Sequence, residues 1–159
     1  MVYLITFNCY GTHLRGAEDG SVDRTRGERG GSIEPSAGLV GYATRVMTHA
    51  EAKLDDNAAA MVLRAILETC LFRNWTLLAA QVRSTHVHVV VNGIIDASGA
   101  IRDFKAYSSR ALNRAGGRRR WARGGNARLL RDSRAVRAAV RYVVDGQGLP
   151  MAVYVAPDL

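Results

Sequence analysis

Residues 75–92, WTLLAAQVRSTHVHVVVN, give the clearest indication of the fold. It contains two apolar, strand-like runs, Trp75–Val82 and His86–Asn92, with only three residues between them. A connection this short suits a β-hairpin, in which the two runs pair as antiparallel strands. The stretch therefore predicts a hairpin with two histidines near the start of its second strand.

The elements on either side of the hairpin predict an α+β sandwich. Before it we expect a strand, Val2–Asn8, and a helix, Asn57–Arg73, whose start Asp55, Asp56 or Asn57 can cap. After it we expect a helix at Ser98–Ala115, capped by Ser98, and then a strand at Asn126–Arg131. A further helix, capped by Asp132 or Ser133, should end near Asp145, and a short strand at Met151–Val155 should follow. This order predicts a mostly antiparallel sheet with helices on one face.

The size of the chain fits a single domain covering residues 1–159, with one long excursion at about residues 11–41. The excursion is rich in Gly and Arg and has little periodicity. No apolar run approaches the roughly 18 residues that a membrane span needs. The start of the chain reads as a strand and has no signal-peptide pattern. We therefore expect a cytoplasmic protein without a membrane partner, in which Cys9 and Cys70 are buried thiols.

The charge of the chain predicts a polyanionic partner. The formal net charge is +8, and it is unevenly distributed. Between Ile101 and Arg141, twelve arginines and Lys105 stand against two aspartates, a local net charge of +11. A basic half of this kind is typical of a nucleic-acid-binding face. The alternative is a solvated surface in a protein with an arginine-rich composition.

His86 and His88 are the candidate metal ligands. On a strand, residues i and i+2 point to the same face, so both imidazoles are expected to project from one surface. Two imidazoles at this spacing can chelate one divalent ion. A pair of half-buried, hydrogen-bonded histidines fits the same spacing equally well.

Two tyrosines on the predicted helices are candidate nucleophiles, Tyr107 and Tyr142. For each of them the alternative is an ordinary aromatic side chain with a satisfied hydroxyl group. Tyr142 follows Arg141, and Gly146 can end its helix so that Gln147 turns back towards the tyrosine. A carboxamide oxygen suits Mg²⁺ or Mn²⁺, which prefer oxygen ligands.

Four motifs, THVHVVV (residues 85–91), KAYSS (105–109), WARGGN (121–126) and YVVDGQ (142–147), follow one another along the chain, and together they resemble the HUH-type single-tyrosine transposases. Residues 85–91, THVHVVV, are similar to the HUH signature strand, and residues 121–126, WARGGN, to the Trp-x-Arg-Gly segment of insertion-sequence 200/605-type transposases. Residues 142–147, YVVDGQ, are similar to their Tyr-Ile-x-x-Gln helix and to the Tyr-Ile-x-x-Asn version of REP-associated tyrosine transposases. Residues 105–109, KAYSS, are similar to the Lys-x-x-Ser-Ser stretch. The resemblance runs in order over about residues 75–148, with Val2–Phe7 as the first strand.

The resemblance implies a ferredoxin-like or RRM-like sandwich with the tyrosine on the third helix. It implies metal-dependent nicking and rejoining of single-stranded DNA through a 5′-phosphotyrosine on Tyr142, with Tyr107 as a lesser candidate. The implied ligands of Mg²⁺ or Mn²⁺ are His86, His88 and Gln147, and the implied partner is single-stranded or hairpin DNA. Two alternatives stay open for the site: one chain supplies all of its residues, or two chains of a homodimer exchange helices to complete it. The expected DNA contacts are Lys105, Arg118, Arg119, Arg120, Trp121, Arg123, Arg128 and Arg141, where Trp121 either stacks on an unpaired base or anchors the core.

The chain departs from the family pattern at the third metal ligand. The family places this ligand four residues after the tyrosine, which here is Gly146, a residue without a side chain. Gln147 stands one residue further, about 140° around an ideal helix from the tyrosine. Either the helix ends at Gly146 and re-aims Gln147, or a water or Asp145 completes the site. Two rival functions stay open: a domesticated, catalytically weak DNA-binding module of the same fold, and an unrelated metal-dependent phosphoesterase or RNA-binding domain.

Overall fold

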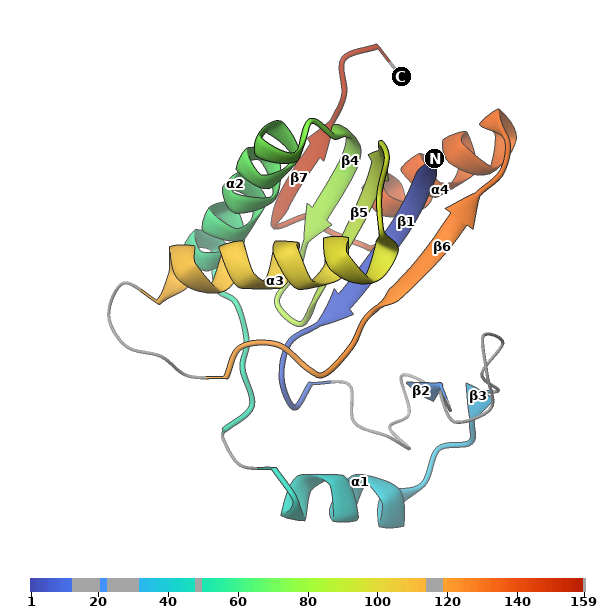
Figure 1. The fold of residues 1–159 in the computed structure, drawn as a ribbon. Coiled ribbons are helices and arrows are strands. Elements are labelled where there is room, and N and C mark those ends of the chain that lie inside the picture. The colour runs from blue at the N-terminus through green and yellow to red at the C-terminus, as the bar shows by residue number, and fades with distance from the viewer. Residues whose placement is uncertain (13–20, 23–31, 48–49, 114–118, 159) are drawn as a thin grey trace.

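The central feature of the protein is a five-stranded antiparallel sheet with the strand order β6-β1-β5-β4-β7 (Figure 1). The computed structural model describes the chain except residues 13–20, 23–31, 48–49, 114–118 and 159. The strands of the sheet are β1 (Val2–Asn8), β4 (Thr76–Val82), β5 (His86–Asn92), β6 (Asn126–Leu130) and β7 (Ala152–Val155). All of its strand pairs are antiparallel. The predicted hairpin and the predicted α+β class are confirmed.

The three long helices are α2 (Asp56–Arg73), α3 (Ala97–Leu112) and α4 (Ser133–Asp145). Each begins after an aspartate whose carboxylate accepts a backbone N–H of the first turn, which satisfies a donor that the helix itself cannot pair. At α2 and α4 these aspartates are Asp55 and Asp132, both among the predicted caps. At α3 the prediction of Ser98 is wrong, because Asp96 reaches the Gly99 N–H at 2.8 Å and starts the helix earlier.

Part of the predicted excursion has regular structure. Two short strands, β2 (Ser21–Val22) and β3 (Ser32–Ile33), pair with each other. A short helix, α1 (Ala37–Arg45), follows Ser36, whose hydroxyl accepts the Leu39 N–H. Helix α1 lies below the sheet in Figure 1 and has no buried residue. Residues 13–20 and 23–31 of the excursion fall outside the described residues.

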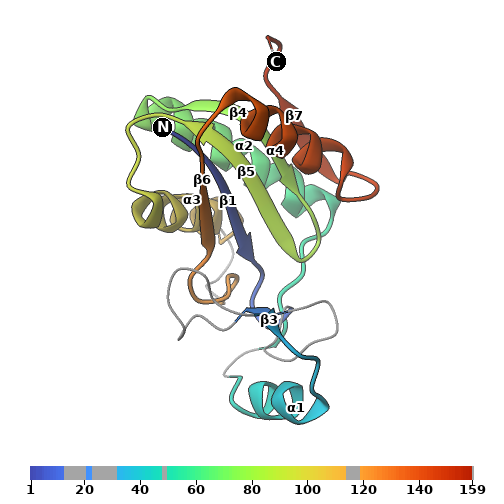
Figure 2. The ribbon, with the colours of Figure 1, turned by 90° about the vertical axis from the view of Figure 1, so that its right-hand side faces the viewer.

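Both faces of the sheet are apolar, and each has its own helical cover. Helices α2 and α3 pack on the face that presents Ile5 and Phe7. Helix α4 packs on the other face (Figure 2). On that face Leu4 and Val90 belong to the same buried apolar cluster as Val143. The expectation that helices cover one face therefore holds for α2 and α3 and is corrected for α4. The physical reason is that β1 and β5 carry apolar side chains at both odd and even positions, so both faces must be buried.

The segment β1-α2-β4-β5-α3-β6 forms a βαββαβ unit with the strand order of a ferredoxin-like sandwich. Strand β7 extends the sheet beside β4, and α4 is added on the second face. Helix α4, which carries Tyr142, is thus the third of the helices that pack on the sheet. No helix in the described part of the chain is long and apolar enough to cross a membrane.

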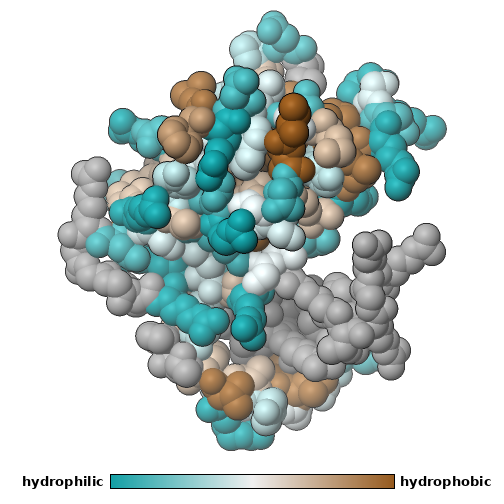
Figure 3. All heavy atoms as spheres, in the orientation of Figure 1, coloured by the Kyte–Doolittle hydropathy of each residue, from teal (hydrophilic) through white to brown (hydrophobic). Residues whose placement is uncertain are grey.

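The surface is mixed in polarity. On the face in Figure 3, hydrophobic side chains of the described residues are scattered between hydrophilic ones. Scattered apolar side chains are ordinary on a protein surface and need no partner to explain them.

Candidate active site

His86 and His88 lie side by side on β5, on the face of the sheet that α4 covers. Their ring centroids are 4.9 Å apart. The hydroxyl oxygen of Thr6, the residue opposite His88 on β1, lies 2.9 Å from His88 Nδ1. The hydroxyl oxygen of Thr85 lies 3.0 Å from His86 Nδ1. Each imidazole is thus oriented through Nδ1 by a threonine, and the structure brings the two rings together as the i, i+2 spacing predicted.

Gln147 lies beside this pair. Its Oε1 is 3.3 Å from His86 Nε2. Helix α4 ends at Asp145 and is capped by Gly146, whose N–H donates to the Tyr142 carbonyl, and the chain then turns Gln147 back towards β5. A Cβ at Gly146 would lie 2.7 Å from the Tyr142 carbonyl oxygen, so this ending requires glycine. The helix thus ends before Gln147, and the carboxamide of this residue lies beside His86, which is the arrangement that the first of the two alternatives requires.

Tyr142 lies against the second histidine. Its ring packs edge to face on His88, with the centroids 5.5 Å apart, and 48% of the residue is exposed. Beside it opens a hollow of about 390 Å³, lined by Leu4, Thr6, Asn126, Arg128, Ala138 and Tyr142. Thr6 belongs both to this hollow and to the hydrogen bond with His88. The tyrosine, the histidines and the hollow therefore form one continuous site.

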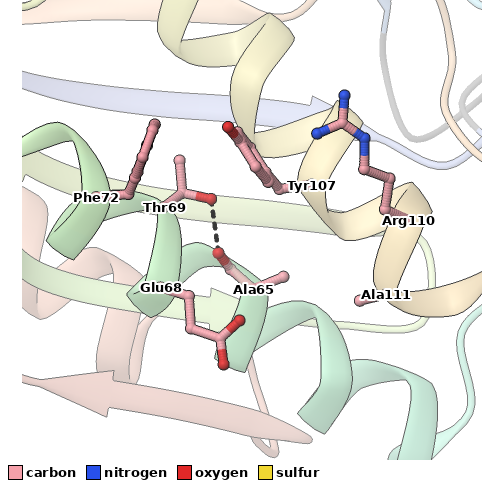
Figure 4. Close-up of a pocket in the computed structure, with 7 residues that line it drawn as sticks. All are labelled: Ala65, Glu68, Thr69, Phe72, Tyr107, Arg110 and Ala111. Atoms are coloured by element: carbon pink, nitrogen blue, oxygen red, sulfur yellow. Dashed lines mark hydrogen bonds between the residues drawn. The ribbon is translucent and has the colours of Figure 1, made fainter.

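Tyr107, the lesser candidate, lies on the opposite face of the sheet. It stands in a groove between α2 and α3, where its ring faces Phe72 at a centroid distance of 6.3 Å (Figure 4). The guanidinium group of Arg110 lies 5.0 Å over the Tyr107 ring. Because the sheet separates this groove from His86 and His88, the structure does not bring Tyr107 to the candidate metal ligands.

Two of the sequence motifs interlock at the edge of the sheet. The Trp121 indole N–H donates to the Lys105 carbonyl at 3.1 Å and to the Ser109 hydroxyl at 3.0 Å. In return, the Lys105 amino group donates to the carbonyls of Ala122, at 2.7 Å, and Gly124. Trp121 is only 8% exposed and packs edge to face on Phe7. The structure thus favours the core-anchor interpretation of Trp121 and gives the Lys105 amino group a role in holding the loop.

The predicted DNA-binding arginines have different surroundings. Arg120 donates to the Asn113 side chain at 3.0 Å and to the Leu112 carbonyl, so it holds the end of α3. Arg119 stacks over the ring of Tyr10. Arg119, Arg123, Arg128 and Arg141 are exposed, and of these Arg128 lines the hollow beside Tyr142. Arg118 lies outside the described residues.

Sequence reasoning missed the two threonines that orient the histidines. Thr85 precedes His86 directly, so its role was within reach of the motif. Thr6 is 82 residues from His88 in the chain, and only the register of β1 against β5 brings the two together. The sequence signal that could have indicated Thr6 is its polar side chain within the otherwise apolar strand β1.

Comparisons with known proteins support the fold. No protein-family profile and no curated protein sequence matches the chain. Among solved structures, it is similar to the REP-associated tyrosine transposase bound to a REP hairpin, with a TM-score of 0.51 and 16% sequence identity. The similarity covers 89% of this chain and 63% of the other. The chain therefore spans less than two thirds of the length of that solved protein, and at this identity the likeness shows a common fold.

Proposed function

We propose that this chain nicks and rejoins single-stranded DNA as an HUH-type enzyme, with Tyr142 as the nucleophile. The observation that carries the proposal is the convergence of Tyr142 and Gln147 with His86 and His88 on one face of the sheet. The fold shared with a transposase that was solved on a DNA hairpin supports the same class of reaction.

The residues present fit a divalent cation of the Mg²⁺ or Mn²⁺ type. Two imidazoles and one carboxamide oxygen are a mixed nitrogen and oxygen donor set that such ions accept. Adjacent ligands of an octahedral ion at about 2.1 Å are about 3.0 Å apart, close to the 3.3 Å between His86 Nε2 and Gln147 Oε1. With Nδ1–H donated to Thr6 or Thr85, each histidine presents the Nε2 lone pair to a metal. A bound ion would supply positive charge for a phosphate group at this site.

The proposed reaction is a transesterification. The Tyr142 oxygen attacks the phosphorus of the DNA backbone, and its proton passes to solvent. The bond between phosphorus and the 3′ oxygen breaks, and that oxygen takes up a proton as a 3′-hydroxyl. The protein is left joined to the 5′ side as a phosphotyrosine, which conserves the ester. A second 3′-hydroxyl reverses the step and joins new ends. The half-exposed position of Tyr142 supports this role, because a DNA strand can reach it.

The hollow beside Tyr142 is the proposed path of the strand. Its volume, about 390 Å³, is within the usual range for small-ligand sites and suits one nucleotide. Arg128 supplies a positive charge at its edge, and Asn126 supplies an amide. The exposed Arg123 and Arg141 add to the positive potential of the basic half.

A test for the covalent intermediate decides the proposal. Protein is incubated with end-labelled hairpin DNA carrying a single-stranded flank, with Mn²⁺, and resolved on a denaturing gel. We expect a DNA–protein adduct whose labelled peptide contains Tyr142. Tyr142→Phe should lose at least 100-fold in adduct yield with unchanged DNA affinity, whereas the matched Tyr107→Phe should retain most of it. An adduct that maps to Tyr107, or one that survives in Tyr142→Phe, contradicts the assignment.

A non-catalytic DNA-binding module is the second candidate. The observation that favours it is again the His86–Gln147 contact, because 3.3 Å also suits a direct hydrogen bond from the imidazole Nε2–H to the amide oxygen. In that case the pair is self-satisfied without an ion. DNA binding without any adduct, and without a response to Mn²⁺, would favour this function.

A further inference from the structure

The segment that carries Gln147 is held by side chains from β4 and from the turn that follows β4. The Gln81 amide Nε2 donates to the Val144 carbonyl at 3.4 Å. The Arg83 guanidinium donates to the Leu149 carbonyl at 3.1 Å. The two accepting carbonyls stand on either side of Gln147 in the chain. We propose that Gln81 and Arg83 form a clamp that fixes residues 144–149, and thereby positions Gln147 against His86; this role rests on the proposed function.

The surroundings of Gln81 support the first half of the clamp. It is fully buried and stands opposite His88 in the β4–β5 register. Its partner, the Val144 carbonyl, belongs to the last turn of α4, where carbonyls have no donor within the helix. The Gln81 Oε1 has no hydrogen-bond partner among the described residues. An apolar side chain would fill this position at lower cost, so the amide is better explained by the helix end that it holds than by core stability.

The surroundings of Arg83 support the second half. Its backbone N–H donates to the His86 carbonyl at 2.9 Å, so the arginine and the histidine share one turn. Its guanidinium lies over Gly148, which has φ +74°, and a Cβ at Gly148 would come within 3.3 Å of Arg83 Nη1. The turn after Gln147 is therefore shaped around this side chain. Arg83 links the strand that carries the histidines directly to the loop that carries the third candidate ligand.

The clamp makes a specific mechanical prediction. Gln147 approaches His86 from a loop that follows a helix end, where backbone amides usually open easily. If the Val144 and Leu149 carbonyls lose their hydrogen bonds to Gln81 and Arg83, the backbone of residues 146–149 should unfold locally more often, while the sheet and α2 keep their contacts. Substitutions of Gln81 and Arg83 should thus perturb the placement of Gln147 more strongly than they reduce the stability of the fold.

The test combines hydrogen exchange with Mn²⁺ binding. The variants are Gln81→Met, which keeps the volume without the amide, Arg83→Ala, and the double variant. Arg64→Ala is the matched control, because Arg64 is an exposed arginine whose ion pair with Glu68 lies on α2. We expect the double variant to exchange the amides of residues 146–149 at least tenfold faster, with those of β1 and α2 unchanged. The dissociation constant for Mn²⁺, measured by electron paramagnetic resonance, should rise at least tenfold in the double variant. Arg83→Lys, which keeps a donor at this position, should bind Mn²⁺ more tightly than Arg83→Ala.

The outcomes separate the clamp from the proposed function. Unchanged exchange at residues 146–149 in the double variant overturns the clamp. Faster exchange with an unchanged Mn²⁺ dissociation constant overturns its positioning role. If the wild-type protein binds no Mn²⁺ and forms no DNA adduct, the proposed function fails, and exchange alone then decides whether Gln81 and Arg83 hold the segment.

Discussion

Thr6 holds His88 across the β1–β5 ladder, with its hydroxyl oxygen 2.9 Å from the imidazole Nδ1. The hydroxyl can accept the Nδ1–H of the tautomer that presents Nε2 to a metal, or donate to Nδ1 of the other tautomer. A buried ring with one fixed nitrogen has little freedom to turn. The relationship therefore sets the direction of the central candidate ligand, and it is compatible with the tautomer that presents Nε2 to a metal.

Replacing Thr6 by valine tests this relationship. Thr6→Val keeps the side-chain shape and removes only the hydroxyl oxygen that orients His88. We expect the Mn²⁺ affinity to fall about 10- to 100-fold, as is usual when an outer partner of a metal-bound histidine is lost. Isothermal calorimetry with Mn²⁺ checks it. Thr44→Val on α1, which removes the hydroxyl that donates to the Val40 carbonyl, is the control and should leave the affinity unchanged.

Trp121→Phe distinguishes an anchor from a base-stacking side chain. An aromatic ring next to Phe7 is kept, but part of the indole volume and the indole N–H that donates to Lys105 and Ser109 are lost. For an anchor, urea denaturation should show a loss of about 1–3 kcal/mol in the free energy of unfolding, while affinity for single-stranded DNA stays the same. Weaker DNA binding at unchanged stability would favour stacking instead.

Arg128→Ala tests the hollow as a path for DNA. Because Arg128 lines the hollow beside Tyr142, its loss should remove about one phosphate contact. The plot of log affinity against log salt should then flatten by about 0.7 for single-stranded DNA. Fluorescence anisotropy at several salt concentrations measures the slope. Arg64→Ala, on α2, should leave it unchanged, and an equal flattening in both variants would argue against a defined path.

The two cysteines predict a loss of stability at alkaline pH. Burial raises the pKa of the Cys9 and Cys70 thiols from the ordinary value of 9.0 to about 12. Above pH 9 the unfolded chain ionises these thiols while the folded chain does not. Their contribution to stability is therefore fully present below pH 9 and is lost as the pH rises towards 12.

Urea midpoints measured from pH 8 to pH 11 check this expectation. The decline should be shallower in Cys70→Ala than in wild type, because one of the shifted groups is gone. At pH 8 both thiols should react with an alkylating reagent far more slowly in the folded than in the unfolded protein. Equal alkylation rates in the two states would contradict burial of the neutral thiols.

The sequence was sufficient for the elements whose periodicity is strong. The hairpin at residues 75–92 follows from two apolar runs and a short connection, and the shared face of His86 and His88 follows from the two-residue period of a strand. Helix α1 was missed because none of its residues is buried, so it leaves no periodic apolar pattern. The face that α4 covers could not be predicted, since both faces of β1 and β5 are apolar.

In the candidate site, too, residues that follow from local spacing could be predicted, and residues that depend on distant contacts could not. Local spacing was enough to bring Gln147 under consideration, because Gly146 marks the helix end. Gln81 was out of reach, since its contact with Val144 joins residues 63 positions apart in the chain. Contacts of this kind depend on strand register and helix placement, which a single sequence specifies only through the complete fold.

The separation of the two helical layers by one sheet has a consequence for evolution and engineering. Among the described residues, the buried side chains under α2 and α3 form one cluster and those under α4 form another, so substitutions on the two sides should combine additively. The α2–α3 layer can then diverge, or be redesigned as an attachment point for a fused domain, without altering the side chains beneath α4. A library confined to the groove around Phe72 and Tyr107 would thus sample new binding partners while the histidine face stays as it is.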